Sequence, residues 1–388
     1  MAWLAGWNHR LSLAADSSDT DKVTDDLAKP SIPIFFKESV GINGDDNWTP
    51  IADEIGTAEA DWNQMAITYG DTKELYVEIE YVDSVNKTAV VWIGDNTDSS
   101  WTVVSGTDRT GWIYYKDGNT NTDRVGAIGS TPGEKVWDSN HVMVQHMVNA
   151  TTRTILRTIL DSTSNDNDGA KKTVSEPVKT ANGKIGDAQL FDGDADYIDV
   201  NNDNSLQITA AITIEVQLYT DAYSNFGRIV EKAPYYFYQN GGYGTVYFNI
   251  PGVDAVLSND SLTLDDWTYA VARYDQSQLK IYFDGVENAT KDASGAMGTD
   301  TTTLRIGHTH VPTTEKAFDG VIDEVRVSNS SRSAAWIKAN FYFQDDDLLY
   351  FGIEETLFAK IANQAFSVIE KIANVALADI EVIAGVPA

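Results

Sequence analysis

Alternation of apolar and polar residues is the main pattern of the chain, and it predicts β-strands. In residues 212–219, ITIEVQLY, every second side chain is apolar, which is typical of a strand with one buried face. The stretches WTYAVARYD (267–275) and LKIYFDGVE (279–287) repeat this pattern. Inside the second of these stretches, Asp284-Gly285 is a hairpin signal, because both positions of a tight primed turn need positive φ.

Strand signals recur at short spacing from about residue 185 to residue 330, and no helical pattern intervenes. A β-sandwich is the most economical architecture for such a series. With 388 residues the chain is too long for one ordinary core, so we expect at least two domains.

Composition limits the partners that the protein can bind. The chain has no cysteine, which excludes disulfides, thiolate metal sites and cysteine nucleophiles. It has 28 Lys and Arg against 58 Asp and Glu, and the formal net charge of −30 repels nucleic acid and anionic lipid surfaces. We therefore predict no nucleic-acid partner. We also predict no membrane insertion, because no stretch is long and apolar enough to span a bilayer.

Five motifs between Leu160 and Phe341 resemble, in their order, the laminin-G-like, concanavalin-A-like jelly roll. They are LDSTSNDNDG, GKIGDAQLFDGDADYIDV, the WTYAVARYD and LKIYFDGV hairpin, LRIGH, and FDGVIDEVRVSNSSRSAAWIKANF. The preceding region, with GWNHRLSLAAD, ELYVEIEYVDSVNKTAVVWI, GWIYYKDGN and KVWDSNHVMVQHM, is similar to an uncharacterised β-rich domain common in microbial and phage surface proteins. The resemblance implies a β-sandwich that binds glycan or protein, frequently with calcium and usually without catalysis.

Pattern and resemblance together predict an all-β protein of two β-sandwich (jelly-roll) domains, followed by a short helical Ala/Ile-rich repeat segment. The expected domains are an N-terminal β-rich domain at 1–150, a laminin-G-like jelly roll at 151–345, and the C-terminal repeat segment at 346–388.

The stretch ILDSTSNDNDGAKK (159–172) concentrates Asp, Asn and Ser but lacks the EF-hand ligand spacing. The resemblance places this loop near the motif GVIDEVRV in such jelly rolls. It therefore implies a structural Ca²⁺ with four candidate ligands, Asp161, Asn165, Asn167 and Asp323. The alternative is that these side chains form turns with their own backbone.

In GVIDEVRV (320–327), strand parity places Asp323 on the same face as Val321, Val325 and Val327. If that face is the core, the carboxylate needs a cation or several backbone N–H groups to compensate its charge.

A search for catalytic carboxylates is needed because related folds also host glycoside hydrolases, which use two carboxyl groups about 5 to 5.5 Å apart or wider. Glu78 and Glu80 alternate in LYVEIEYVD, but the polar side of an ordinary strand explains them better. Asp323 and Glu324 are expected to point to opposite faces. No Ser-His-Asp elbow, phosphate loop or zinc motif occurs, so we predict that the protein is not an enzyme.

The densest aromatic stretch, residues 235–243, offers rings that could stack on sugar faces. Its candidate glycan-binding residues are Tyr236, Tyr238 and Tyr243. The alternative is a core strand that ends in a Gly-rich hairpin, since Tyr236 and Tyr238 share one parity and Phe237 has the other.

The C-terminal segment repeats every eleven residues, either as a continuous helix or as short turns that end at Asn or Gly. One chain cannot cover its apolar rows, so we predict a homo-oligomer, with a trimer favoured, or docking to a partner. The predicted oligomerisation residues are Phe358, Ile361, Ile369, Ile372, Ile380 and Ile383.

The N-terminus MAWLAGWNHR lacks the pattern of a secretory signal, which is compatible with a trimmed signal or with assembly into a virus particle. Short repeats like those at the C-terminus resemble the ends of phage virion proteins. We therefore predict a non-enzymatic virion structural protein, a tail or head fibre or a capsid decoration, at the virion surface. Its partners would be host or environmental glycans and other virion proteins. The alternatives are a secreted cell-surface adhesin or lectin and a polysaccharide-degrading enzyme.

Overall fold

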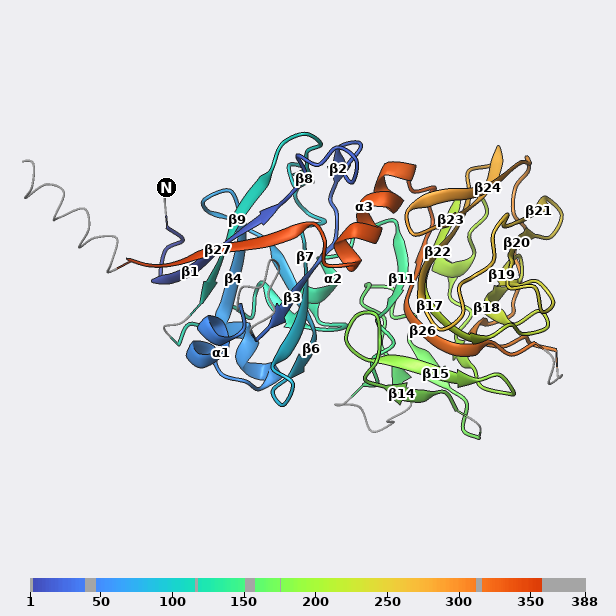
Figure 1. Ribbon diagram of the computed structural model, residues 1–388, viewed down its shortest axis with the longest axis horizontal. Coiled ribbons are helices and arrows are strands. Elements are labelled where there is room, and N and C mark those ends of the chain that lie inside the picture. The colour runs from blue at the N-terminus through green and yellow to red at the C-terminus, as the bar shows by residue number, and fades with distance from the viewer. Residues whose placement is uncertain are drawn as a thin grey trace, which may run out of the picture.

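The computed structural model describes residues 3–38, 47–115, 118–150, 158–174, 176–311 and 316–357. Two β-sandwich units lie side by side, and helix α3 (Ala334–Gln344) lies between them (Figure 1). The predicted all-β fold with two sandwiches is confirmed. No helix among the described residues combines the length and the apolar character needed to cross a lipid bilayer.

The first unit is built from two sheets around an apolar core that includes Trp62, Phe36 and Val91. Its five-stranded sheet has the order β27 (Leu349–Thr356), β1 (His9–Ala15), β9 (Arg109–Tyr115), β4 (Met65–Tyr69), β5 (Lys73–Glu74). Its four-stranded sheet has the order β10 (Val125–Ala127), β6 (Tyr76–Asp83), β7 (Thr88–Gly94), β3 (Ile32–Lys37). The smaller elements are the ribbon β2 (Leu27–Ala28) with β8 (Thr102–Val103), the helices α1 (Thr49–Ile55) and α2 (Thr131–Glu134), and the 3-10 helix η2 (Glu59–Gln64).

The second unit is a jelly roll of two eight-stranded sheets, and its strands come mainly from the alternating stretches of the sequence. The inner sheet has the order β14 (Val178–Thr180), β15 (Ala188–Asp192), β26 (Asp319–Ser328), β17 (Ile212–Ala222), β22 (Trp267–Tyr274), β23 (Gln278–Phe283), β24 (Val286–Asp292), and β11 (His141–Gln145) also pairs with β26. The outer sheet has the order β12 (Thr158–Ile159), β13 (Gly169–Lys171), β16 (Ile198–Val200), β25 (Leu304–Ile306), β18 (Arg228–Lys232), β19 (Tyr235–Gln239), β20 (Val246–Ile250), β21 (Asp254–Leu257). A 3-10 helix, η3 (Asn204–Leu206), lies between β16 and β17.

The core of the second unit lies between these two sheets. In β17, Ile214 and Val216 point into the core with Phe237 and Phe248 of the outer sheet. Glu215, on the opposite face of β17, is also buried, because the first unit and α3 cover that face of the inner sheet. Strand alternation therefore identifies the two faces correctly but does not reveal that both are covered.

Two strands cross the predicted division of the chain. Strand β11, within the predicted domain 1–150, pairs with β26 of the second unit. Strand β27, within the predicted segment 346–388, pairs with β1 of the first unit and packs Leu349 and Phe351 into the first core. The chain therefore passes from unit to unit more than once, as the position of β27 beside β1 makes visible (Figure 1). The predicted oligomerisation residues, from Phe358 onward, lie outside the described residues.

A β-bulge in β26 changes which face each of its side chains occupies. Along one edge, β15 pairs with residues 319–322 and β11 pairs with residues 325–328, and the register with β17 slips between Asp323 and Arg326. Glu324, at the slip, has a φ of 51°, in the left-handed region. The predicted shared face of Asp323 with Val325 and Val327 is therefore wrong, because the extra residue turns Asp323 toward the first unit while both valines enter the second core.

Candidate functional site

Two predicted tyrosines lie on the outer face of the outer sheet. Strand β19 alternates strictly, so that Tyr235 and Phe237 are buried in the second core while Tyr236 and Tyr238 are half-buried on the opposite face. The third candidate, Tyr243, lies in the turn between β19 and β20 and is 74% exposed. The strand thus has a core side, as the parity indicates, and a second side that presents rings.

The rings on this face form a connected group around Tyr238. Its ring centroid lies 5.5 Å from that of Tyr247 on β20 and 6.3 Å from that of Phe226, which is 38% exposed. The guanidinium of Arg228 lies 4.3 Å from the centre of the Tyr238 ring, within cation–π distance. Sequence reasoning missed Tyr247, although its alternation with Val246 and Phe248 in VYFNI was a usable signal.

A row of polar side chains crosses the same face beside the rings. Strand pairing aligns Asp199, Arg305, Glu231, Tyr236 and Asn249 on neighbouring strands. Arg305 donates two hydrogen bonds to Asp199, at 2.7 and 3.1 Å, and Glu231 forms an ion pair with an arginine of its own strand. We call the rings and this row, Arg228 included, the tyrosine face. It offers stacking surfaces next to donors and acceptors, and both of its carboxylates are ion-paired.

Asp161, the first predicted calcium ligand, is buried in a network of its own loop. Its carboxylate accepts backbone N–H groups of Val144, Thr163 and Asn167 at 2.8 to 3.0 Å and the hydroxyl of Thr163 at 2.7 Å. Burial raises the pKa of Asp161 to about 7, and these hydrogen bonds oppose the shift. The loop therefore contains the side-chain turns that were the alternative to a calcium site.

The other predicted ligands divide between two places. Asn165 and Asn167 stay near Asp161, where both side-chain amides donate to the carbonyl of Val142. Asp323 instead accepts the backbone N–H groups of Ile185, at 3.0 Å, and of the adjacent Glu324, at 2.8 Å. Two backbone N–H groups thus meet this buried carboxylate. Calcium binding by the four residues stays a prediction.

A buried group of charged side chains lies where the two units meet, and we call it the junction cluster. His146 Nδ1 lies 2.6 Å from Glu324 Oε1 and 3.4 Å from Glu80 Oε2, and His146 Nε2 lies 3.3 Å from Glu78 Oε2. Arg326 donates to Glu324 Oε2 through Nε at 3.2 Å and through Nη2 at 2.5 Å. The cluster therefore joins β6 of the first unit, the end of β11, and the bulge in β26.

Two indole rings enclose the junction cluster. Trp92 Nε1 donates to Glu80 Oε2 at 2.5 Å, and Trp137 Nε1 donates to Glu78 Oε2 at 2.7 Å. The His146 ring stacks on Trp92, with centroids 5.3 Å apart. The expectation that Glu78 and Glu80 occupy the polar side of an ordinary strand is wrong, because the second unit covers that side and leaves them 0% and 4% exposed.

Charge and burial act on the ionisation of this cluster in opposite directions. Burial alone would lower the pKa of His146, but the carboxylates of Glu324 and Glu80 outweigh it and hold that pKa well above its usual range. Burial also raises the pKa of Glu80 and that of Asp323 well above the ordinary values. The expectation that Asp323 and Glu324 point to opposite faces is wrong as well, since the bulge brings both to the junction.

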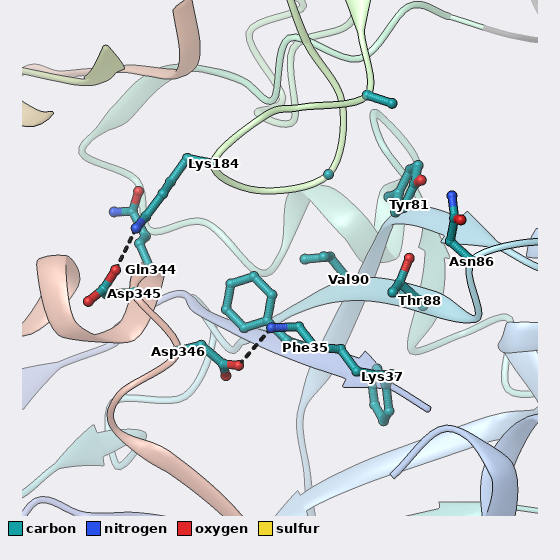
Figure 2. Close-up of a pocket in the computed structure, with 14 residues that line it drawn as sticks. Phe35, Lys37, Tyr81, Asn86, Thr88, Val90, Lys184, Gln344, Asp345 and Asp346 are labelled. Carbon is teal, nitrogen blue, oxygen red and sulfur yellow. Dashed lines mark hydrogen bonds and ion pairs between the residues drawn. The ribbon is translucent and has the colours of Figure 1, made fainter. Parts of the chain in front are cut away.

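An open cleft of about 400 Å³ lies between the two units, and Figure 2 shows its lining. Phe35 and Tyr81 come from the first unit, and the end of α3 contributes two ion-paired acids. Lys37 Nζ lies 3.1 Å from Asp346, and Lys184 Nζ lies 2.5 Å from Asp345. No sequence pattern indicated this cleft, because its walls come from strands, a loop and a helix that are far apart in the chain.

A match to a known protein family supports the fold of the second unit. Residues 191–338 match the laminin G family described as the Concanavalin A-like lectin/glucanases superfamily. No curated protein matches the chain's sequence. Among solved structures, the chain is similar to the binding domain of Paraclostridial Mosquitocidal Protein 1, with 9% identity, a TM-score of 0.41, and 52% of each chain covered.

Two further solved structures are similar to the chain at comparably low identity. Domain 4 of AbnA, a GH43 extracellular arabinanase from Geobacillus stearothermophilus in complex with arabinotriose, gives 14% identity, a TM-score of 0.40, and coverage of 52% of this chain and 98% of that one. The binding domain of botulinum neurotoxin serotype D gives 12% identity, a TM-score of 0.39, and coverage of 53% and 51%. The chain thus spans about half the length of the two toxin binding domains. The family match and the two eight-stranded sheets agree with the sequence motifs that the second unit is a laminin-G-like, concanavalin-A-like jelly roll.

Proposed function

We propose that the protein is a non-enzymatic glycan-binding protein and that the glycan lies on the tyrosine face. The observation that carries the proposal is the group of half-exposed rings around Tyr238, with Arg228 and Tyr247 in contact with it. Aromatic rings bind the apolar faces of sugars, and neighbouring charged and amide groups orient the hydroxyls. Because this site is the open face of a sheet, it suits an extended glycan chain that crosses several strands.

The ion pairs of this face are the reason for proposing binding without hydrolysis. A glycosidase needs one carboxylic acid that protonates the leaving group and a second carboxylate that acts as nucleophile or base. Asp199 and Glu231 each have an arginine partner, so both carboxylates of this face are held in ion pairs instead of facing an open site as a catalytic pair.

We further propose that the protein belongs to the exterior of a virus particle, with the tyrosine face turned outward and the C-terminal repeat segment used for assembly. The net charge of −30 suits a surface exposed to salt, and the eleven-residue repeat suits self-association or docking. A secreted adhesin is the second candidate. A gene neighbourhood of capsid and tail genes selects the first, and a secretion signal encoded upstream selects the second.

The glycan proposal is tested by screening the purified protein on a glycan array and measuring the affinity of the best ligand by calorimetry. Replacing Tyr238 and Tyr247 together by Ala removes two aromatic contacts of about 0.5–1.5 kcal/mol each, so binding should weaken about 5-fold to 150-fold. The matched control is Tyr81→Ala in the cleft, which should bind as the wild type does.

Unchanged affinity in the double variant contradicts the location on the tyrosine face. Loss of binding in Tyr81→Ala alone transfers the site to the cleft of Figure 2. Release of reducing ends from the bound polysaccharide contradicts the non-enzymatic part of the proposal.

A further inference from the structure

We propose that Glu80, His146 and Glu324 of the junction cluster bind one divalent transition-metal ion, zinc in the first place, which fixes the two units to each other. One candidate ligand atom of each residue lies within 4.8 Å of those of the other two, and all three residues are buried. Imidazole nitrogen and carboxylate oxygen are ligands that zinc accepts at about 2.0–2.2 Å. The site is separate from the tyrosine face and does not depend on glycan binding.

Two of the three side chains already have a partner on the atom that faces away from the proposed ion. Glu324 Oε2 accepts from Arg326, which leaves Oε1 next to His146 Nδ1. His146 Nε2 lies against Glu78, so that a proton on Nε2 leaves Nδ1 as the metal ligand. A histidine held by a carboxylate on one nitrogen and by a metal on the other is a recurrent arrangement in metal sites.

Glu80 is the third candidate ligand. Its Oε2 lies 3.4 Å from His146 Nδ1 and accepts the indole N–H of Trp92. Its Oε1 has no hydrogen-bond partner among the described residues, although the side chain is buried. A cation bound by this carboxylate would compensate its buried charge.

The cluster holds more carboxylates than cationic side chains. Glu78, Glu80 and Glu324 all contact the single imidazole of His146, and Arg326 is a cationic partner of Glu324. A divalent cation in place of an imidazole proton would keep these buried carboxylates paired, as buried charges need to be. The neighbouring Asp323 is compensated separately by two backbone N–H groups.

A glycine loop covers the cluster on the side of the cleft. The loop 183–186 donates the Ile185 N–H to Asp323, and a Cβ at Gly186 would come within 2.7 Å of Glu80 Oε1. Gly186 also has a φ of 58°, so two constraints favour glycine at this position. Because the ligands are covered from both units, the ion would enter as the chain folds.

The experiment is to unfold the full chain in denaturant with chelator and refold it with or without one equivalent of zinc. After gel filtration the metal content is measured by inductively coupled plasma mass spectrometry, and the melting temperature is recorded. We expect about one zinc per chain and a higher melting temperature, since an ion bound only by the folded state stabilises it. Glu80→Gln and Glu324→Gln should lose the zinc.

The matched control is Glu215→Gln, which changes a buried glutamate on the same side of the inner sheet whose carboxylate accepts the Tyr269 hydroxyl instead, and it should retain the zinc. X-ray absorption of zinc-loaded wild type needs no variant and should give one imidazole and carboxylate oxygens around the metal. The proposal is overturned if wild type refolded with zinc retains no metal, or if both ligand variants retain the zinc. A spectrum that shows no imidazole, or several, around the metal also overturns it. The cluster would then be an ion-pair network held by protons.

Discussion

Strand β27 completes the first sandwich, and replacing Phe351 by Ala tests this directly. Phe351 is 6% exposed, belongs to the first core, and has its ring centroid 6.0 Å from that of Phe36. It is paired with Leu13 on β1, so it lies in the middle of the strand pair. A buried Phe→Ala change costs about 3–5 kcal/mol, from lost burial and from the cavity that remains.

The assay is urea unfolding followed by tryptophan fluorescence, with Val286→Ala as the matched control. Val286 is 63% exposed on β24, so its truncation should change the free energy of unfolding by less than about 0.5 kcal/mol. Two truncations extend the test. Ending the chain after Leu357 keeps every described strand, whereas ending it after Leu348 removes β27 and should unfold the first unit at much lower urea. A loss below about 1 kcal/mol for Phe351→Ala, or equal midpoints for the two truncations, would refute the role of β27.

Four further predictions concern the buried pair of Asp138 and Arg332, the loop at Asp161 and the C-terminal segment. Asp138→Ala leaves Arg332 buried without the carboxylate that it now contacts at 2.6 and 2.7 Å. Urea unfolding should therefore show a free energy of unfolding that is lower by about 3–5 kcal/mol, and a decrease below about 1 kcal/mol would argue against a buried pair. Because burial raises the pKa of Asp161 to about 7 from 3.8, its proton stabilises the folded state below about pH 4, and this contribution is lost as the pH rises through 7. In chelator the melting temperature should therefore fall from pH 4 to pH 7 less steeply in Asp161→Asn than in the wild type, and equal slopes would contradict the assignment. If calcium binds at Asp161, added chelator at pH 7 should lower the melting temperature of the wild type but not that of Asp161→Asn. If the wild type responds neither to chelator nor to added calcium, the loop residues form side-chain turns without an ion. The chain that ends after Leu357 should be a folded monomer by light scattering, and an unchanged oligomer would move the interface to the sandwiches.

The sequence pattern along a single strand was enough to predict the features that depend on that strand alone. The alternation in YYFYQ predicted which side chains of β19 share a face, and the motif order predicted the jelly roll. The bulge at Glu324 was not predictable in this way, because it is defined by the slip against β17, which lies about a hundred residues away in sequence. Parity arguments fail after such a residue, which is why the side assigned to Asp323 was wrong.

Burial of Glu78 and Glu80 also depends on a partner that sequence periodicity does not contain. A polar residue on alternate positions of a strand is compatible with solvent or with a second unit, and only the packing of β26 and His146 against β6 decides between them. A usable signal was present in the neighbouring tryptophans, since Trp92 and Trp137 need acceptors for their indole N–H groups when they are buried.

The pairing of β1 with β27 has a mechanical consequence. His9, where β1 begins, lies opposite Thr356, where β27 ends, so these two residues lie at the same end of one antiparallel strand pair. Tension applied between His9 and Thr356 would separate this pair one hydrogen bond at a time, as in unzipping, instead of loading all its bonds together in shear. The jelly roll, inserted between these strands in the sequence, would stay outside the path of the force until β27 had detached. A pull on a glycan held by the tyrosine face would follow a different path, through the jelly roll and across the junction between the units.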